Sequence, residues 1–280
     1  MSTSPPIPVS RLSVTAFATG LAGGLVNAAV VVGLYAHGEY PVLESTTATA
    51  VLALTAACVG FVPLFLAAYT RLIVPAVGVL AALLGTVWLE VTTPTPEWGE
   101  LGGFVIVDGP THASSYANTW YLWLALAVLA AVVEFRLRQQ YGVGADRLRN
   151  LPETLSRANW IGIVSGTALL LGAASSLLVV RSGIGSTAGA LVVFFVAAAV
   201  TAVPLWATFE DGAIVPLALY LPVPYFLVIE VFVTTDSPVH LLLFGPYAIV
   251  LAIVWLLERT IRTRFGSSGV GGRTADGRRG

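Results

Sequence analysis

The sequence predicts an all-α integral membrane protein, in which eight transmembrane helices form two parallel four-helix repeats with both termini in the cytoplasm. Three observations predict this class. The 280 residues are 56% hydrophobic and 10% charged, whereas soluble domains carry roughly 25% charged residues. Eight apolar stretches are long enough to cross a bilayer, which takes about 20 residues each. A segment of the first half also recurs in the second half.

The eight predicted spans are continuous apolar stretches separated by short polar segments. The first of them follows Arg11 and is about twice as long as the apolar region of a signal peptide, so we interpret it as a helix. The spans lie near residues 12–36, 47–69, 72–92, 118–137, 159–181, 188–208, 213–234 and 239–258.

The arginines predict the orientation. All 14 basic residues are arginines. With the N-terminus in the cytoplasm, Arg11, Arg71, the five from Arg136 to Arg157 and the six from Arg259 to Arg279 face the inside, and only Arg181 faces the outside. The positive-inside rule therefore predicts an N-in, C-in topology. We expect a multi-pass protein of a prokaryotic cell membrane.

An internal duplication is indicated by a shift of 141 residues. It aligns residues 45–75 with residues 186–216 at twelve identical positions out of 31, including two copies each of "VPL" and "IVP". Two prolines in each copy bracket a tight hairpin between the second and third helices, because proline is tolerated in the first turn of a helix. Four helices per copy give two repeats in the same orientation.

The predicted organisation follows from these spans. Residues 1–140 form the first four-helix repeat and residues 159–262 the second. Residues 141–158 form a polar cytoplasmic linker, and residues 263–280 form a glycine- and arginine-rich disordered tail. In the first helix, Gly20 and Gly24 are expected to let another helix approach closely, and Asn27 to form a hydrogen bond across helices.

Acidic residues at the ends of two spans are candidate functional groups. Glu90 and Glu230 lie in matching "EVTT" and "EVFVTT" contexts, near the edge of the hydrocarbon region. An ionisable group in a span is a candidate for an ion or substrate pathway. The alternative is a side chain that reaches the aqueous interface without further role. A twelve-residue insertion containing Glu97, Trp98 and Glu100 follows the first copy only.

A D-x-P-x-H pattern occurs after each of these glutamates. It comprises Asp108 and His112 in the first copy and Asp236 and His240 in the second. Each Asp is expected to cap the following helix, with Pro in its first turn. Capping leaves the histidines unexplained, so a divalent-metal site or a proton-sensing site is the alternative.

Proline interrupts the seventh and eighth spans. Pro222 and Pro224 lie at the middle of the seventh span, and "FGPY" with Tyr247 lies within the eighth. Tyr225 flanks the first break. Breaks at membrane depth persist only where freed backbone groups are buried or face a cavity, and they mark binding sites in transporters. Kinks that serve shape alone are the alternative.

These features favour a small-solute or ion transporter with its pathway between the repeats, formed by Glu90, Glu230, Pro222, Pro224, Tyr225 and Tyr247. Two alternatives remain: a non-catalytic subunit that stabilises partner membrane proteins, and a membrane-embedded enzyme using a metal. No nucleotide-binding, zinc-protease or serine-hydrolase motif occurs, so an enzyme is the less favoured reading. No cofactor is predicted. The expected partners are the lipid bilayer and a membrane protein or second copy, and no nucleic acid.

Overall fold

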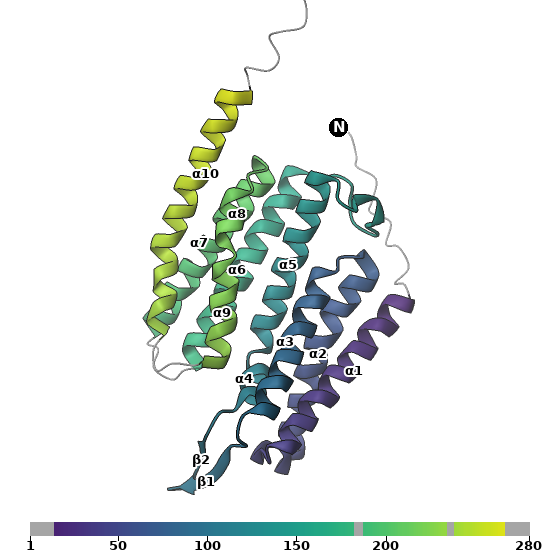
Figure 1. The fold of residues 1–280 in the computed structure, drawn as a ribbon, viewed down its shortest axis with the longest axis vertical. Helices are drawn as coiled ribbons and strands as arrows, with labels where there is room; N and C mark the ends of the chain where they lie inside the picture. Colours follow the sequence, from purple (N-terminus) through teal and green to yellow (C-terminus); the bar gives the residue numbers. More distant parts are fainter. Residues whose placement is uncertain (1–13, 182–186, 234–237, 267–280) are drawn as a thin grey trace, which may run out of the picture. The chain divides into compact units, whose positions relative to one another are not determined.

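The residues that the structure describes form eight helical spans, as predicted. The computed structural model describes residues 14–181, 187–233 and 238–266, and its elements are arranged as drawn in Figure 1. Eight segments of these residues are long and apolar enough to cross a membrane. The protein is therefore a multi-pass membrane protein in contact with the lipid bilayer.

Six of the eight spans are single helices, and two are composite. The single ones are α1 Val14–His37, α2 Thr46–Thr70, α3 Val74–Thr92, α5 Trp120–Tyr141, α6 Arg157–Arg181 and α7 Thr187–Glu210. The seventh span combines α8 Val215–Tyr220 with α9 Pro222–Val233, and the eighth combines the end of η3 Pro238–Leu243 with α10 Phe244–Gly266. Short elements complete the chain: η1 Pro41–Glu44, β1 Glu97–Leu101, β2 Phe104–Asp108, α4 His112–Asn118 and η2 Ala145–Arg147.

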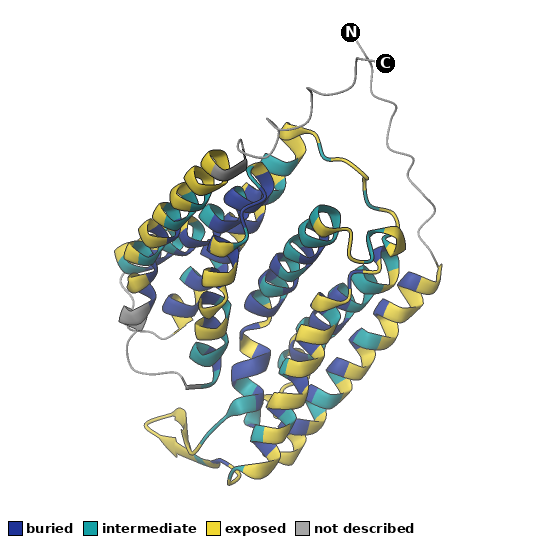
Figure 2. Ribbon diagram, turned by 45° about the horizontal axis from the view of Figure 1, so that its top comes forward, coloured by how far each residue is buried: buried dark blue, intermediate teal, exposed yellow. Residues whose placement is uncertain are grey.

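The helices expose apolar side chains along their length, as lipid-facing helices do. Figure 2 shows exposed positions distributed along the spans. Leu84 and Trp88 of α3, for example, are 67% and 69% exposed. An apolar surface of this extent is stable in hydrocarbon, where exposed leucine and tryptophan meet lipid chains and headgroups.

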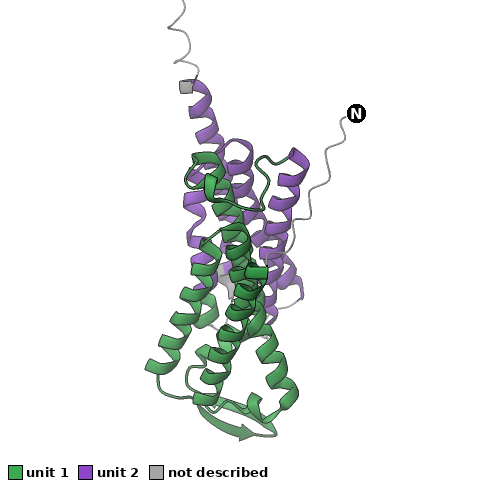
Figure 3. Ribbon diagram, turned by 90° about the vertical axis from the view of Figure 1, so that its right-hand side faces the viewer, with its two compact units in different colours: residues 1–155, 229–234 green, residues 156–228, 235–280 purple. Residues whose placement is uncertain are grey.

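The chain divides into two compact units, coloured in Figure 3. Unit 1 contains residues 1–155 and 229–234, and unit 2 contains residues 156–228 and 235–280. Within unit 1, α2 packs on α1, α3 and α5, and within unit 2, α7 packs on α6, α8 and α10. The four-plus-four duplication remains a prediction, which this correspondence of packing supports.

Close backbone approach joins α1 to α2. A Cβ on Gly60 would lie 2.3 Å from the Gly23 carbonyl oxygen, and one on Gly24 would lie 2.8 Å from the Ala57 carbonyl oxygen. Only glycine fits at such crossings. One turn on, the Asn27 amide donates to the Ala56 carbonyl oxygen at 2.7 Å. The expected close packing and cross-helix hydrogen bond in this helix are both confirmed.

The hairpin between the second and third helices of each half has the predicted prolines. Pro75 and Pro216 occupy the first turns of α3 and α8, while Pro63 and Pro204 lie inside α2 and α7. The turn after α2 places Arg71 in the left-handed conformation with φ 63°, and the turn after α7 does the same at Gly212 with φ 67°.

The segment predicted as a linker is ordered against unit 1. Leu148, Leu151 and Leu155 pack on the cluster formed by Leu72, Ala131 and Phe135. The Asn150 amide donates to the Tyr69 carbonyl oxygen at 2.8 Å at the end of α2. This segment therefore covers one end of the unit 1 helices.

The twelve-residue insertion forms an antiparallel β-hairpin, which the sequence analysis did not anticipate. Its strands pair from Glu97 opposite Asp108 to Leu101 opposite Phe104. Gly102 and Gly103 form the turn with φ of 61° and 82°, the conformation that a two-residue hairpin loop requires. The hairpin emerges from the end of unit 1 at which α3 ends (Figure 1).

Candidate functional site

Glu90 lies at the centre of a buried hydrogen-bonded cluster at the hairpin end of unit 1. Its side chain is 4% exposed, in the last turn of α3. One carboxylate oxygen accepts from the Tyr40 hydroxyl at 2.6 Å, and the other accepts from the backbone N–H of Ala113 at 2.8 Å. The interpretation that this glutamate simply reaches out to water is therefore wrong, because protein groups engage both oxygens.

Tyr40 connects the cluster to the hairpin. Its ring packs against Tyr35 and Trp98, with centroid distances of 4.3 and 5.0 Å. The Trp98 indole N–H donates to the Gly38 carbonyl oxygen at 2.8 Å. Burial raises the pKa of the Tyr40 phenol above its ordinary value, and the hydrogen bond to Glu90 raises it further. Tyr40 therefore stays protonated as a donor to the carboxylate.

The first D-x-P-x-H copy is arranged differently from the capping prediction. Asp108 is exposed at the end of β2, and α4 begins at His112 with Thr111 as its N-cap residue and no side-chain cap. The expected Asp108 cap is wrong. Glu90 binds the N-terminus of α4 instead, through Ala113. A carboxylate from a neighbouring helix thus does what a local Asp was expected to do.

The second copy lies largely outside the described residues. Glu230 is half-buried in the last turns of α9. Asp236 lies outside the described residues, and of His240 only the backbone, in η3, is described. Within the described part of the chain, no three His, Cys, Asp or Glu side chains are grouped so as to hold a metal ion. The metal or proton site of Asp108, His112, Asp236 and His240 stays a prediction.

The break in the seventh span is stabilised by a tyrosine of the eighth. Because Pro222 and Pro224 carry no N–H, the helix cannot continue its regular hydrogen bonds there, and α8 ends at Tyr220 before α9 begins at Pro222. The Tyr247 hydroxyl donates to the Leu219 carbonyl oxygen. A carbonyl next to the break is thereby satisfied by a side chain of α10.

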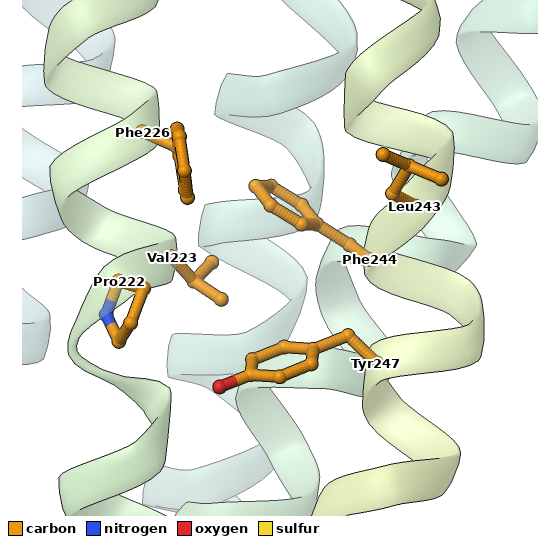
Figure 4. Close-up of a pocket in the computed structure, with 6 residues that line it drawn as sticks. All are labelled: Pro222, Val223, Phe226, Leu243, Phe244 and Tyr247. Carbon is orange, nitrogen blue, oxygen red and sulfur yellow. The ribbon is translucent and has the colours of Figure 1, made fainter.

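A pocket lies beside this break, within unit 2. It has a volume of about 340 Å³ and is lined by α9 on one side and by η3 and α10 on the other, as Figure 4 shows. Val223 at its base is 1% exposed, whereas Phe226 and Leu243 at its rim are 47% and 66% exposed. The lining residues are Pro222, Val223, Phe226, Leu243, Phe244 and Tyr247.

The predicted pathway residues are thus only partly brought together. Pro222 and Tyr247 line the pocket, whereas Tyr225 is 62% exposed and does not. Tyr220, next to the break, is buried and shares a hydrogen bond of 2.9 Å with the Thr201 hydroxyl. The pocket wall is apolar apart from the Tyr247 hydroxyl, and no acidic side chain lines it.

Two acidic residues that the sequence analysis did not single out bind helix N-termini. The Glu134 carboxylate accepts from the N–H groups of Ile73 and Val74 at 2.9 and 2.8 Å. The Glu258 carboxylate accepts from those of Ile214 and Val215 at 3.3 and 3.1 Å. Each glutamate precedes an arginine by four residues in its sequence, a spacing that favours an ion pair on one helix face.

These features define a polytopic helical membrane protein with buried carboxylates that bind helix ends and an apolar pocket at a broken helix. No protein-family model, curated protein or solved structure matches the chain.

Proposed function

We propose that this protein is a transporter of a small amphiphilic solute, whose apolar part binds in the pocket beside the α8–α9 break. The single observation that carries the proposal is the coincidence of a pocket with an interrupted membrane-spanning helix. Interrupted helices at membrane depth are characteristic of transporter binding sites. The proposal includes the solute pathway between the two repeats that the sequence predicts, with Glu90 and Glu230 along it.

The chemistry of the pocket supports an apolar rather than an ionic ligand. Its volume of about 340 Å³ lies at the lower end of the range for small-molecule sites, roughly 300 to 1,000 Å³. An ion would need charged or several polar ligands, and the wall offers two phenylalanines, a valine, a leucine and a proline beside Tyr247. The Tyr247 hydroxyl is already donated to Leu219, so only its oxygen lone pairs remain for a solute.

The broken helix also supplies a means of changing shape. Helix α8 contains only six residues, and Leu221 alone separates it from Pro222 at the start of α9. The Tyr247 hydroxyl of α10 donates a hydrogen bond to the Leu219 carbonyl oxygen beside this break. One such hydrogen bond contributes on the order of 1 kcal/mol, which a bound solute can offset. Movement of α9 against α10 would open or close the pocket.

Uptake by proteoliposomes tests the proposal. The measured quantity is the rate of uptake of two fluorescent amphiphiles of opposite charge, ethidium and 8-anilinonaphthalene-1-sulfonate. Leu243→Trp should fill the pocket from its exposed rim and reduce saturable uptake about tenfold, equivalent to about 1.4 kcal/mol of binding. Leu242→Trp is the matched control, since Leu242 is 40% exposed and does not line the pocket. Absence of saturable uptake of both probes, or equal effects of the two variants, would contradict the proposal.

A further inference from the structure

The β-hairpin of unit 1 exposes more apolar surface than a segment in water normally does. Leu101 and Phe104, which flank the turn, are 69% and 77% exposed, and Val105 is 62% exposed. Every residue of β2 is exposed. A two-stranded sheet without a covering layer is at best marginally stable in water. Contiguous exposed apolar groups generally mark a surface that contacts something else.

The two faces of the hairpin differ. Strand pairing places Trp98 opposite Val107 on one face, and Trp98 fixes that face to unit 1 through Gly38 and Tyr40. On the other face, Glu97 is opposite Asp108 at the base, and Leu101 is opposite Phe104 at the tip, with Ile106 between them. This second face is therefore acidic at its base and apolar at its tip.

The position of the hairpin brings it close to the lipid surface. Only residues 93–96, with Pro94 and Pro96 among them, separate it from the end of α3. Four extended residues reach at most about 14 Å. In the last two turns of α3, Trp88 and Val91 are 69% and 58% exposed, and exposed tryptophan is typical of the membrane–water interface. The exposed apolar surface of α3 therefore ends only four residues before the hairpin begins.

We propose that the hairpin lies in the membrane–water interface at this end of unit 1, with Leu101, Phe104 and Ile106 inserted among the lipid headgroups. The bilayer already contacts the neighbouring surface of α3, so the same surroundings cover the apolar tip without a further component. Glu97 and Asp108, like charges directly opposite each other, remain in water at the base. The hairpin contains no basic residue, so the lipid surface that it fits is zwitterionic rather than anionic.

Spin labelling tests the immersion depth, because the chain has one cysteine, Cys58. In a Cys58→Ala background, a nitroxide is attached at Phe104→Cys, and the protein is placed in phosphatidylcholine nanodiscs. Collision rates with oxygen, which concentrates in lipid, and with a nickel chelate, which stays in water, are measured. Leu84→Cys on α3, where Leu84 is 67% exposed, is the lipid control. Val143→Cys, where Val143 is 72% exposed in a turn outside the spans, is the water control.

If the proposal is correct, the ratio of the oxygen collision rate to the nickel-chelate collision rate at position 104 should be well above the ratio at position 143. It should approach the ratio at position 84. A ratio equal to that at 143 would overturn it, since the tip would then be in water. Low collision rates with both reagents would also overturn it, because a partner protein or a second copy would then cover the tip. Since Phe104 is 77% exposed, the label does not disturb a packed site.

Discussion

Glu134 and Glu258 play the same part in the two units: each binds the first N–H groups of the helix that begins with an Ile-Val-Pro sequence. Each also pairs with an arginine one turn later, Arg138 or Arg262, at 2.5 Å. The guanidinium of that arginine in turn donates to a carbonyl oxygen just beyond the preceding helix, that of Arg71 or Asp211. A shared arrangement of this detail supports the predicted duplication.

Glu134→Gln should destabilise unit 1. The amide has one oxygen acceptor in place of two, and it leaves Arg138 without its carboxylate. Loss of buried charge-assisted hydrogen bonds costs roughly 1 to 3 kcal/mol, which should lower the thermal unfolding midpoint in detergent. Glu153→Gln is the control, since Glu153 is exposed in the segment after η2. Equal midpoints for both variants would show that Glu134 does not contribute to stability.

Burial of the Tyr40 phenol, together with its hydrogen bond to Glu90, should make stability fall at alkaline pH. The pKa of Tyr40 is raised in the folded protein above the ordinary value of 10.0, so its contribution is present below about pH 10 and is lost as pH rises beyond it. Tyr40→Phe should be less stable at neutral pH by roughly 1 to 3 kcal/mol. The difference from the unmodified protein should shrink above pH 10, as measured by chemical unfolding at several pH values. A difference that is constant with pH would contradict this coupling.

Gly60→Ala should weaken the packing of α1 on α2. The added methyl group would lie 2.3 Å from the Gly23 carbonyl oxygen, so the helices must move apart, at a cost of roughly 1 to 3 kcal/mol. Gly85→Ala in α3 is the control, because nothing lies within 4 Å of its Cβ position. That control should be neutral or stabilising by up to about 1 kcal/mol. Unfolding midpoints that order the two variants the other way would contradict the packing account.

The predicted orientation can be tested with cysteine labelling in intact cells. In a Cys58→Ala background, Ala145→Cys in η2 should react with a membrane-impermeant maleimide only after permeabilisation. Glu97→Cys at the exposed base of the hairpin should react without it. The physical reason is the arginine distribution, which predicts that η2 lies in the cytoplasm. The reverse labelling pattern would invert the topology.

Much of the buried network around Glu90 could not be predicted from the sequence. The position of Glu90 near a helix end and its candidate status follow from hydropathy alone, but its partners Tyr40 and Ala113 lie 50 and 23 residues away in the chain. The internal repeat likewise did not align Glu134 with Glu258, the two glutamates that bind helix N-termini. They stand 124 residues apart, whereas the aligned prolines stand 141 apart, because the segments between the helices differ in length.

By itself the sequence determined the eight spans and the proline-bracketed turns. Lipid imposes these features locally, since each spanning segment must be apolar and must satisfy its own backbone hydrogen bonds. Tertiary structure alone decided that Glu90 rather than Asp108 binds the start of α4, and that a pocket opens beside Pro222. Those outcomes depend on which distant groups meet when helices pack, and apolar periodicity carries no information about such meetings.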